Sequence, residues 1–417
     1  MSEHTDVLII GGGVIGLSSA YYLNRAGRSV RIVEQNIIGS GASYGNCGMV
    51  CPSHAPPLTQ PGVVATGLKW MLKSDAPLFI RPTLNLRTIS WLLHFAARCN
   101  AERMRPAMIA RAEILKSSRV AYDAFIEAEN LAAAIEWSPV GALFVCREDA
   151  TMDHCAHHFG LVAEFGMNAV PLAGAELAAK EPALRDDVAG AWYFDLDAHL
   201  RPDRLMREWH RINLERGVTV TENSAVSAIH EDGDKITGVM TSSGSFTADS
   251  VVVATGAWSS QLAGMFHTQI PIEPGKGYSI TTTCPQLSPV FPCAFQERRC
   301  IATPFQSGYR LGGTMEFSGF DPQLRQNRID AIRRAAAEYM KEPEGDTVEE
   351  LWYGWRPMTY DGVPIIGQLP KHRNAYIAAG HNMLGLSMAT GTGKLISELL
   401  TGAEPHIDPR PYSPDRF

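Results

Sequence analysis

The sequence predicts an α/β protein, in which a Rossmann-like dinucleotide-binding domain lies beside a second domain of antiparallel sheet and helices. Three observations support this prediction. The chain begins with an apolar strand, a glycine-rich turn and a helix at 6–26, and a second apolar strand follows at 30–33. Residues 274–279 and 309–316 alternate in polarity as strands of an antiparallel sheet do. The 417 residues are enough for two domains, each with its own core.

The first strand leads directly into a phosphate-binding motif. Val7 to Ile10 is an all-apolar run, typical of a strand buried on both faces. The pattern G-x-G-x-x-G follows at Gly11, Gly13 and Gly16. The first glycine permits the tight turn, the second lets the backbone approach a pyrophosphate, and the third lets the helix pack closely on the strand. The free N–H groups and positive dipole of the helix N-terminus then favour phosphates.

Glu34 ends the second strand about 20 residues after the motif, where dinucleotide-binding folds place an acidic residue. Its carboxylate can accept hydrogen bonds from both ribose hydroxyls and would repel a 2′-phosphate, so the pattern disfavours NADP. A bare glycine motif is often only a turn. Because strand, helix and acidic residue are all in register, the pattern favours nucleotide binding.

Composition argues against several functional classes. Lysine and arginine number 37 against 44 acidic residues, and the net charge of −7 argues against nucleic acid as the main partner. We expect no signal peptide, and no apolar run approaches the ~20 residues of a membrane span, so a cytoplasmic protein is expected. The eight cysteines show no paired C-x-x-C spacing, which favours reduced thiols over a zinc ribbon or a disulfide scaffold.

Residues 75–200 are the least informative part of the sequence. Leu86 to Ala97 has helical apolar spacing, and the stripe around Trp91 is either core or a contact for a membrane surface or a partner subunit; core is favoured. A later helix is expected to contain His154 and His158, four residues apart. Such a pair suits a metal, but no second ligand set is apparent, so a solvated helix face is favoured and no metal is expected.

The remaining elements are expected from periodicity and turn residues. Helices are expected at 107–132, 151–165, 203–216, 323–341 and 392–400, and strands at 140–146, 218–221, 226–230, 236–241, 245–248, 250–253 and 375–378.

Three segments together resemble one family. Residues 39–71 form a long loop of small residues, 352–367 read W-x-G-x-R-P-x-T-x-D-G-x-P-x-x-G, and 380–391 are a second glycine-rich loop before a helix. They resemble bacterial D-amino acid dehydrogenases, which belong to the glycine oxidase and D-amino acid oxidase superfamily. The resemblance implies a discontinuous FAD-binding domain and a substrate-binding domain. We place the first at 1–85, 196–260 and 350–417, and the second at 86–195 and 261–349.

The resemblance assigns the substrate carboxylate to Arg356, the arginine of the second segment. A guanidinium in a flavin cavity suits bidentate binding of a planar carboxylate. The alternative is a structural ion pair, with Asp361 as the partner. Tyr278 matches a family position that lines the substrate pocket, where its hydroxyl could reach the carboxylate; a buried sheet tyrosine is nearly as well supported.

Two histidines complete the candidate catalytic set. The loop at 380–386 resembles the family loop around the pyrimidine edge of the flavin, where His381 either lies over the ring or only orients the loop. Backbone N–H groups there would stabilise the anionic reduced flavin. His54 lies in the first loop, where D-amino acid dehydrogenases tend to have an aromatic residue. This departure leaves the identity of the substrate open.

The resemblance also implies non-covalent FAD, because 380–391 contains no cysteine; Cys47 in the first loop leaves a covalent link as the alternative. The expected FAD-binding residues are Gly11, Gly13, Val14, Ile15, Gly16, Glu34, Gln35, Gly41, Ala42, Ser43, Asn46, Gly48, Met49, Val226, Thr255, Gly256, Gly380, Met383, Leu384 and Gly385.

The implied reaction is oxidative deamination of a D-amino acid, with hydride transfer from Cα to flavin N5 and hydrolysis of the imino acid to a 2-oxo acid. Electrons would pass to a quinone-type or other acceptor. Rival substrates are D-proline or D-hydroxyproline, an N-methyl amino acid and an opine. With one of these substrates, the chain is also a candidate flavin subunit of a heteromeric complex. A peripheral position on the inner face of the membrane is an alternative location. An NAD-dependent dehydrogenase would leave the loops at 39–52 and 380–391 unexplained, and a non-catalytic flavin-binding subunit would leave Arg356 without a role.

Overall fold

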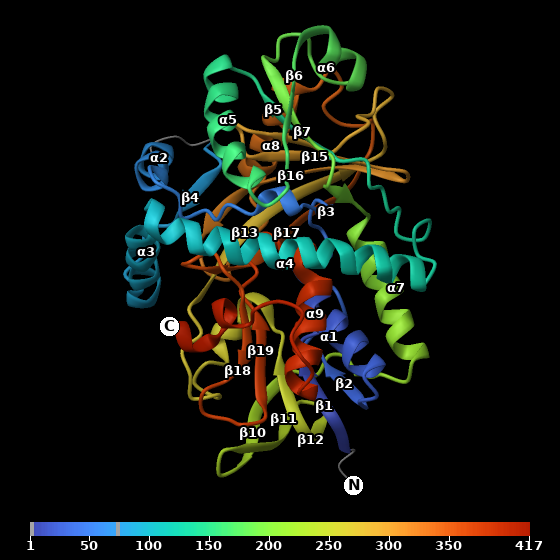
Figure 1. The fold of residues 1–417 in the computed structure, drawn as a ribbon, viewed down its shortest axis with the longest axis vertical. Helices are drawn as coiled ribbons and strands as arrows, with labels where there is room; N and C mark the ends of the chain where they lie inside the picture. The colour runs from blue at the N-terminus through green and yellow to red at the C-terminus, as the bar shows by residue number, and fades with distance from the viewer. Residues whose placement is uncertain (1–3, 72–75) are drawn as a thin grey trace.

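The computed structural model describes residues 4–71 and 76–417. Residues 1–3 and 72–75, which the expected boundaries assign to the first domain, lie outside the described residues. The molecule is built around two large sheets, and the long helix α4 (Ala101–Ala128) lies across the middle between them (Figure 1). A small antiparallel pair of β3 (Met49–Val50) and β8 (Ala198–His199) also forms. The predicted mixed α/β class is confirmed.

The first sheet contains the nucleotide motif. Its strands are β1 (His4–Ile10), β2 (Val30–Val33), β9 (Thr219–Thr221), β10 (Val226–Asp232), β11 (Lys235–Thr241), β12 (Gly244–Val253), β18 (Ile365–Gln368) and β19 (Ala375–Ala379). The strands β9, β2, β1, β12 and β19 run parallel in that order. Val7–Ile10 lies in register with 30–33 and 250–253, so the glycine motif follows the carboxyl edge of buried parallel strands. This is where doubly wound folds bind nucleotides.

Helices from distant parts of the chain pack together beside this sheet. They are α1 (Val14–Arg25), α7 (Pro202–Glu215) and α9 (Gly385–Thr401), and Figure 1 shows α1 in blue directly beside α9 in red. A Cβ on Gly393 would overlap Ser18, so α9 approaches α1 closely because residue 393 has no side chain. On its other side α9 contacts α4, where Thr390 Oγ1 lies 2.8 Å from Ser118 Oγ.

The second sheet is mostly antiparallel. Its strands are β4 (Leu78–Ile80), β5 (Ala142–Cys146), β6 (Val170–Leu172), β7 (Gly190–Phe194), β13 (Ile272–Thr282), β14 (Cys293–Phe295), β15 (Cys300–Phe305), β16 (Gly308–Phe317) and β17 (Val348–Thr359). They are ordered β17-β13-β16-β15-β14-β5-β7-β6, and β4 pairs with β16. Helix α8 (Gln326–Tyr339) packs on one face, where Ile329 and Ile332 join the core of β13 and β16. The other face of this sheet borders a large cavity.

The remaining helices lie at the edges of the two sheets. They are α2 (Val63–Met71), α3 (Leu86–Arg98), α5 (Asp149–Ala163) and α6 (Gly174–Lys180), with short 3-10 turns at Pro52–His54, Gly256–Gln261, Arg410–Tyr412 and Pro414–Arg416. Trp91 of α3 is buried and its indole N–H donates to the carbonyls of Pro271 and Met358, so the tryptophan itself belongs to the core. Within the described part of the chain, every helix is too short or too polar to serve as a membrane span.

Strand pairing places several segments differently from the expected domain boundaries. The boundary at residue 350 falls inside β17, whose pairing with β13 extends from Thr359 back to Val348. β4 pairs with β16 although it precedes residue 85. Conversely, α4 packs on α9 and the nucleotide-binding layer, although its residues were assigned to the second domain. Each of these segments packs with the sheet or helix that buries its apolar face, and the position of the segment in the sequence does not decide this.

Candidate active site

A cavity of about 1120 Å³ extends between the two sheets. Its wall begins at the turn after β1, continues along the loop at 39–49 and reaches β13, β16 and β17 of the second sheet. It therefore joins the glycine motif to the candidate substrate residues in one continuous space.

The glycines of the first motif are required by close backbone contacts. A Cβ on Gly11 would lie 2.6 Å from the carbonyl oxygen of the residue after β12, and one on Gly16 would overlap the carbonyl of Gly11. Gly13 is the N-cap of α1 and makes no side-chain cap, and of the N–H groups in the first turn that of Val14 donates to Ser43 Oγ at 2.9 Å. The first turn of α1 therefore presents backbone N–H groups and a positive dipole to the cavity, as a pyrophosphate site requires.

Backbone contacts hold the Glu34 carboxylate in place at the same end. Its Oε2 accepts from the Gly12 N–H at 2.7 Å and its Oε1 accepts from the Asn36 N–H at 2.9 Å. Glu34 also lines the cavity. Each oxygen keeps a second lone pair, so a carboxylate fixed in this way can still accept from the two hydroxyls of a ribose.

Most of the expected FAD-binding residues line the cavity, and three glycines lie behind its wall. Gly16 is one, in the helix–strand contact. Gly48 has φ +71° and a Cβ there would overlap the carbonyl of Leu200; Gly380 has φ +77° and a Cβ there would lie 2.6 Å from Thr359 Cγ2. Only glycine tolerates both the left-handed backbone and the crowding. We therefore assign Gly48 and Gly380 to the shape of the two loops.

The N-terminus of α9 also faces the cavity. Leu384 is the N-cap residue with no hydrogen bond from a side chain of the described chain, and Met383 and Gly385 line the cavity beside it. His381 is buried, its Nε2 lies 3.0 Å from Thr392 Oγ1, and burial lowers its pKa to about 3. The neutral ring is thus tied to α9, which favours the loop-orienting role for His381.

Two open helix N-termini, α1 for a pyrophosphate and α9 for an electron-rich ring, fit the two halves of FAD. Bound FAD supplies a hydride acceptor in such a site. The chain itself supplies the donors, the apolar walls and the residues that orient a substrate.

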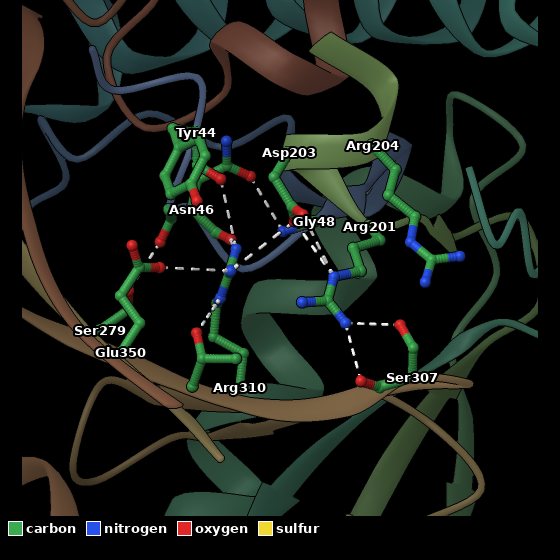
Figure 2. A network of polar contacts seen from close by, with 12 residues as sticks. Tyr44, Asn46, Gly48, Arg201, Asp203, Arg204, Ser279, Ser307, Arg310 and Glu350 are labelled. Atoms are coloured by element: carbon green, nitrogen blue, oxygen red, sulfur yellow. Dashed lines mark hydrogen bonds and ion pairs between the residues drawn. The ribbon is translucent and has the colours of Figure 1, made fainter. Parts of the chain in front are cut away.

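The second sheet holds the loop at 39–49 through buried polar contacts (Figure 2). Arg310 of β16 is buried, and its Nη1 donates to the carbonyls of Tyr44 and Asn46 at 3.3 and 3.0 Å. Ser279 of β13 donates to the carbonyl of Gly45 at 2.7 Å. Because three consecutive carbonyls are bonded to neighbouring strands, the loop position depends on the second sheet.

Two acidic groups compensate the charge of Arg310. Its Nη2 lies 3.8 Å from Asp203 Oδ1 and 3.9 Å from Glu350 Oε2 (Figure 2). Burial lowers the pKa of Arg310, and the two carboxylates oppose that shift. Asp203 also accepts from Arg201, whose guanidinium reaches Ser307 instead of the loop. The network therefore contains an arginine that contacts the loop and one that does not.

Arg356 lies in the cavity wall opposite this loop. Its Nη1 donates to the carbonyl of Thr314 at 2.9 Å, and a Cβ on Gly277 would overlap the guanidinium. Burial lowers its pKa. The expected alternative partner, Asp361, instead binds Arg416 with 2.8 Å between Oδ2 and Nε. Within residues 4–71 and 76–417 no carboxylate forms an ion pair with Arg356, so its charge is available to a ligand.

The Tyr278 side chain points away from Arg356. Along β13, Gly277 and Ser279 face the cavity side, whereas the Tyr278 hydroxyl donates to Glu316 Oε2 at 3.1 Å in the opposite layer. Period-two alternation of a strand causes this difference. The geometry agrees with a buried sheet tyrosine and disagrees with a hydroxyl that reaches the substrate carboxylate.

His54 lies in the cavity wall and takes part in a cluster that the sequence did not indicate. Cys51, His54 and Asp197 each place a potential ligand atom within 4.8 Å of the others. Asp197 accepts from Ser53 N–H at 3.1 Å and from Ser53 Oγ at 2.5 Å, and burial raises its pKa to about 7. Burial lowers the pKa of His54 to about 4. The cluster is thus a buried, largely neutral hydrogen-bonding group.

Arg310, Ser279 and Asp197 are site residues that sequence reasoning missed. The strands that carry the first two were expected, and the alternation of β13 contained the signal for Ser279. Cys47, the residue behind the covalent alternative, is enclosed by β16, and burial raises its pKa. Non-covalent FAD stays a prediction.

Known proteins share this arrangement. The profile of the DAO family, FAD dependent oxidoreductase, matches residues 6–399. The D-amino acid dehydrogenase of Granulibacter bethesdensis is 31% identical, with 96% of this chain and 97% of the relative covered, and that of Methylobacterium nodulans is 32% identical with 99% of each covered. The solved glycine oxidase of Geobacillus kaustophilus has a TM-score of 0.80 at 23% identity, with 100% of both chains covered, which shows a shared fold.

The family match extends over both sheets and both ends of the cavity, so it includes the nucleotide motif and the segment around Arg356. It confirms the resemblance and the FAD cofactor. The chain belongs to the DAO family of FAD-dependent oxidoreductases.

Proposed function

We propose that the chain oxidises D-amino acids to 2-oxo acids, with Arg356 binding the substrate carboxylate. The observation that carries this proposal is the cavity-facing guanidinium of Arg356, whose charge no carboxylate of the described chain pairs. The curated relatives named D-amino acid dehydrogenase support the choice of substrate class.

The chain's task in this reaction is orientation. A bidentate contact from Arg356 would fix the carboxylate plane, and the wall between Arg356 and the loop at 45–49 would limit the orientations open to the rest of the substrate. A substrate whose amine enters neutral needs no protein base. His381 has a lowered pKa and stays uncharged, so it does not compete with Arg356 for the carboxylate. Water converts the imino acid product to the 2-oxo acid and ammonia.

We also propose a quinone-type electron acceptor that reaches the cavity through α2 and α3. α2 has no buried residue, and its Leu68 is 62% exposed although it lines the cavity. Leu93 of α3 is 66% exposed. An apolar surface at a cavity mouth suits an apolar acceptor and a peripheral contact with a membrane. D-proline, D-hydroxyproline, N-methyl amino acids and opines remain rival substrates, the chain then serving as a candidate flavin subunit.

The test is the visible spectrum of purified protein and its anaerobic bleaching by D- and L-amino acids, D-imino acids and N-methyl amino acids. We expect bleaching by D-amino acids and a rise in KM of roughly 100-fold or more in Arg356→Ala, because a charge-assisted bidentate contact is lost. Arg373→Ala, which removes a surface arginine paired with Asp234, should leave KM unchanged. Bound flavin that no D-amino acid bleaches would refute the proposal, and turnover by the purified chain alone would exclude a non-catalytic subunit.

A further inference from the structure

A second arginine enters the cavity from the hairpin between β14 and β15. Arg299 lines the cavity, and its side chain keeps accessible surface although the surrounding protein lowers its pKa by desolvation. Its backbone has φ +51°, a left-handed conformation that is uncommon for a residue with a side chain. Its N–H donates to the carbonyl of Phe295 at 2.8 Å. The tight hairpin therefore fixes the direction in which the guanidinium leaves the sheet.

The charge of Arg299 has no ion-pair partner within residues 4–71 and 76–417. Among the groups whose charge opposes the lowering of its pKa, after the Cys155 thiol, Glu297 is the carboxylate. That carboxylate is already occupied, because it accepts from the backbone N–H of Arg147 at 2.9 Å and from the Tyr339 hydroxyl at 2.5 Å. Arg299 is exposed and lines the cavity, so its guanidinium is open to an anionic ligand there.

Two neutral histidines, His54 and His158, line the same cavity as this guanidinium. Burial, followed by the neighbouring positive groups that include Arg299, lowers the pKa of His54 and of His158 to about 4. Each ring therefore offers one N–H donor at neutral pH without adding charge. His54 Nδ1 is buried and has no hydrogen-bond partner in the described chain. A cation with two neutral donors is a suitable set for one carboxylate.

Arg299, from the hairpin between β14 and β15, and Arg356, from β17, contact neighbouring residues of β16. The carbonyl of Arg299 lies 3.2 Å from the Cβ position of Gly313, and the guanidinium of Arg356 is bonded to the carbonyl of Thr314. Both side chains line the cavity. Two anchors set by adjacent residues of β16 are suited to the two ends of one small ligand.

We propose that Arg299 binds a second carboxylate of the substrate, so that the preferred substrates are dicarboxylic amino or imino acids. The proposal rests on the proposed function for the role of Arg356. The second carboxylate has two sources: the side chain, as in D-glutamate, or a substituent on nitrogen, as in iminodiacetate. His154 and His158, expected on a solvated helix face, then belong to the cavity wall.

The test compares Arg299→Met with Arg298→Met in the holoenzyme. Arg298 lies on the same hairpin but pairs with Glu338, with 2.7 Å between Nε and Oε2, so its removal changes the charge equally outside the cavity. KM is measured for D-glutamate, iminodiacetate and D-alanine, and flavin spectral titrations give the Kd of glutarate and butyrate, which cannot be oxidised.

We expect Arg299→Met to raise KM for a dicarboxylic substrate and Kd for glutarate by about tenfold or more, with less than about twofold change for D-alanine and butyrate. Arg299→Lys should restore part of the loss, and Arg298→Met should cause none. A larger effect on D-glutamate or on iminodiacetate identifies the source of the carboxylate. Equal losses for D-alanine and D-glutamate, or no loss for either dicarboxylate, would overturn the proposal.

The same data separate this proposal from the proposed function. If D-alanine reduces the flavin but the Kd of glutarate is the same in Arg299→Met as in the wild type, the second-carboxylate site is refuted. The proposed oxidation of D-amino acids then stands. If no D-amino acid reduces the flavin while glutarate still binds in an Arg299-dependent way, the reaction is refuted and the site stands.

Discussion

Asp197 shows how burial alters one carboxyl group at the cavity edge. The side chain is fully buried, and burial raises its pKa from 3.8 to about 7 despite two hydrogen bonds from Ser53. Between about pH 4 and pH 7, the folded chain keeps a proton that the unfolded chain has released. The free energy of unfolding therefore falls as pH rises through this window.

We predict that Asp197→Asn removes most of this pH dependence. The wild-type contribution amounts to roughly 4 kcal/mol between pH 4 and pH 8, since each pKa unit corresponds to about 1.4 kcal/mol. Urea unfolding of the FAD-loaded protein at pH 4.5, 6 and 8 measures it. Asp186→Asn, at an exposed site 84% accessible, is the matched control and should keep the wild-type slope. The same slope in Asp197→Asn would contradict the assigned shift.

At the scale of single residues, the sequence predicts those cavity residues that belong to a motif of fixed spacing. Gly11, Glu34 and Arg356 lie in motifs of fixed spacing, and all three line the cavity as expected. Arg299 and Arg310 carry no such spacing. Their positions depend on the pairing of β14, β15 and β16, which joins side chains that no local signal connects.

Among the structural elements, the loop at 41–49 depends most on its neighbours. Met49, the first residue of β3, is its only strand residue, and the backbone carbonyls of the loop accept hydrogen bonds from side chains of β13, β15 and β16. Because the loop has almost no strand pairing of its own, its position depends on these side-chain hydrogen bonds.

We predict that Arg310→Met weakens FAD binding by about tenfold, because two charge-assisted hydrogen bonds to the loop are lost. Arg201→Met is the control, since it removes a guanidinium from the same network without touching the loop. Fluorescence titration of the apoprotein with FAD gives both dissociation constants. Equal weakening in the two variants would mean that the network stabilises the fold generally and does not position the loop.

Periodicity predicts the elements well where apolar residues dominate. β2 has the expected bounds, and α3 extends a residue past the expected end. α9 begins at Gly385 instead of Thr392, because the small polar residues of its first turns have weak helix propensity but are buried against α1 and α4. The separate strands expected at 245–248 and 250–253 form one strand, β12, which pairs with β11 in its first half and with β19 in its second.

On the scale of the whole molecule, α2 and α3, which carry exposed apolar residues, lie near the same end of the long helix α4 (Figure 1). We predict that Leu68→Ser combined with Leu93→Ser lowers the affinity for anionic phospholipid vesicles by about tenfold or more, because burial of each leucine contributes about 1.5–3 kcal/mol. Reduction of a long-chain quinone should fall with it, while reduction of a short water-soluble quinone stays unchanged.

Val120→Ser on α4 is the control for this prediction, because Val120 is 71% exposed but does not line the cavity. Vesicle co-sedimentation and anaerobic quinone assays measure the two effects. Vesicle binding that is absent in the wild type, or equal in all variants, would refute the membrane contact.

The fold class was predictable because the glycine motif and the alternating strands specify different sheets. The exact division was less predictable. β17 pairs with β13 of the second sheet and α4 packs on α9, and sequence periodicity does not report such long-range contacts. The division into two domains stays a prediction.

The packing of α9 on α1 has a consequence for biosynthesis. α1 emerges from the ribosome early, but its partner at 385–401 is translated after more than nine-tenths of the printed sequence. β1 must likewise wait for β12 before both of its edges are paired. The nascent chain therefore cannot complete its flavin site during most of translation, so FAD is captured at the end of synthesis, and chaperones have a long interval in which to shield the unpaired βαβ unit.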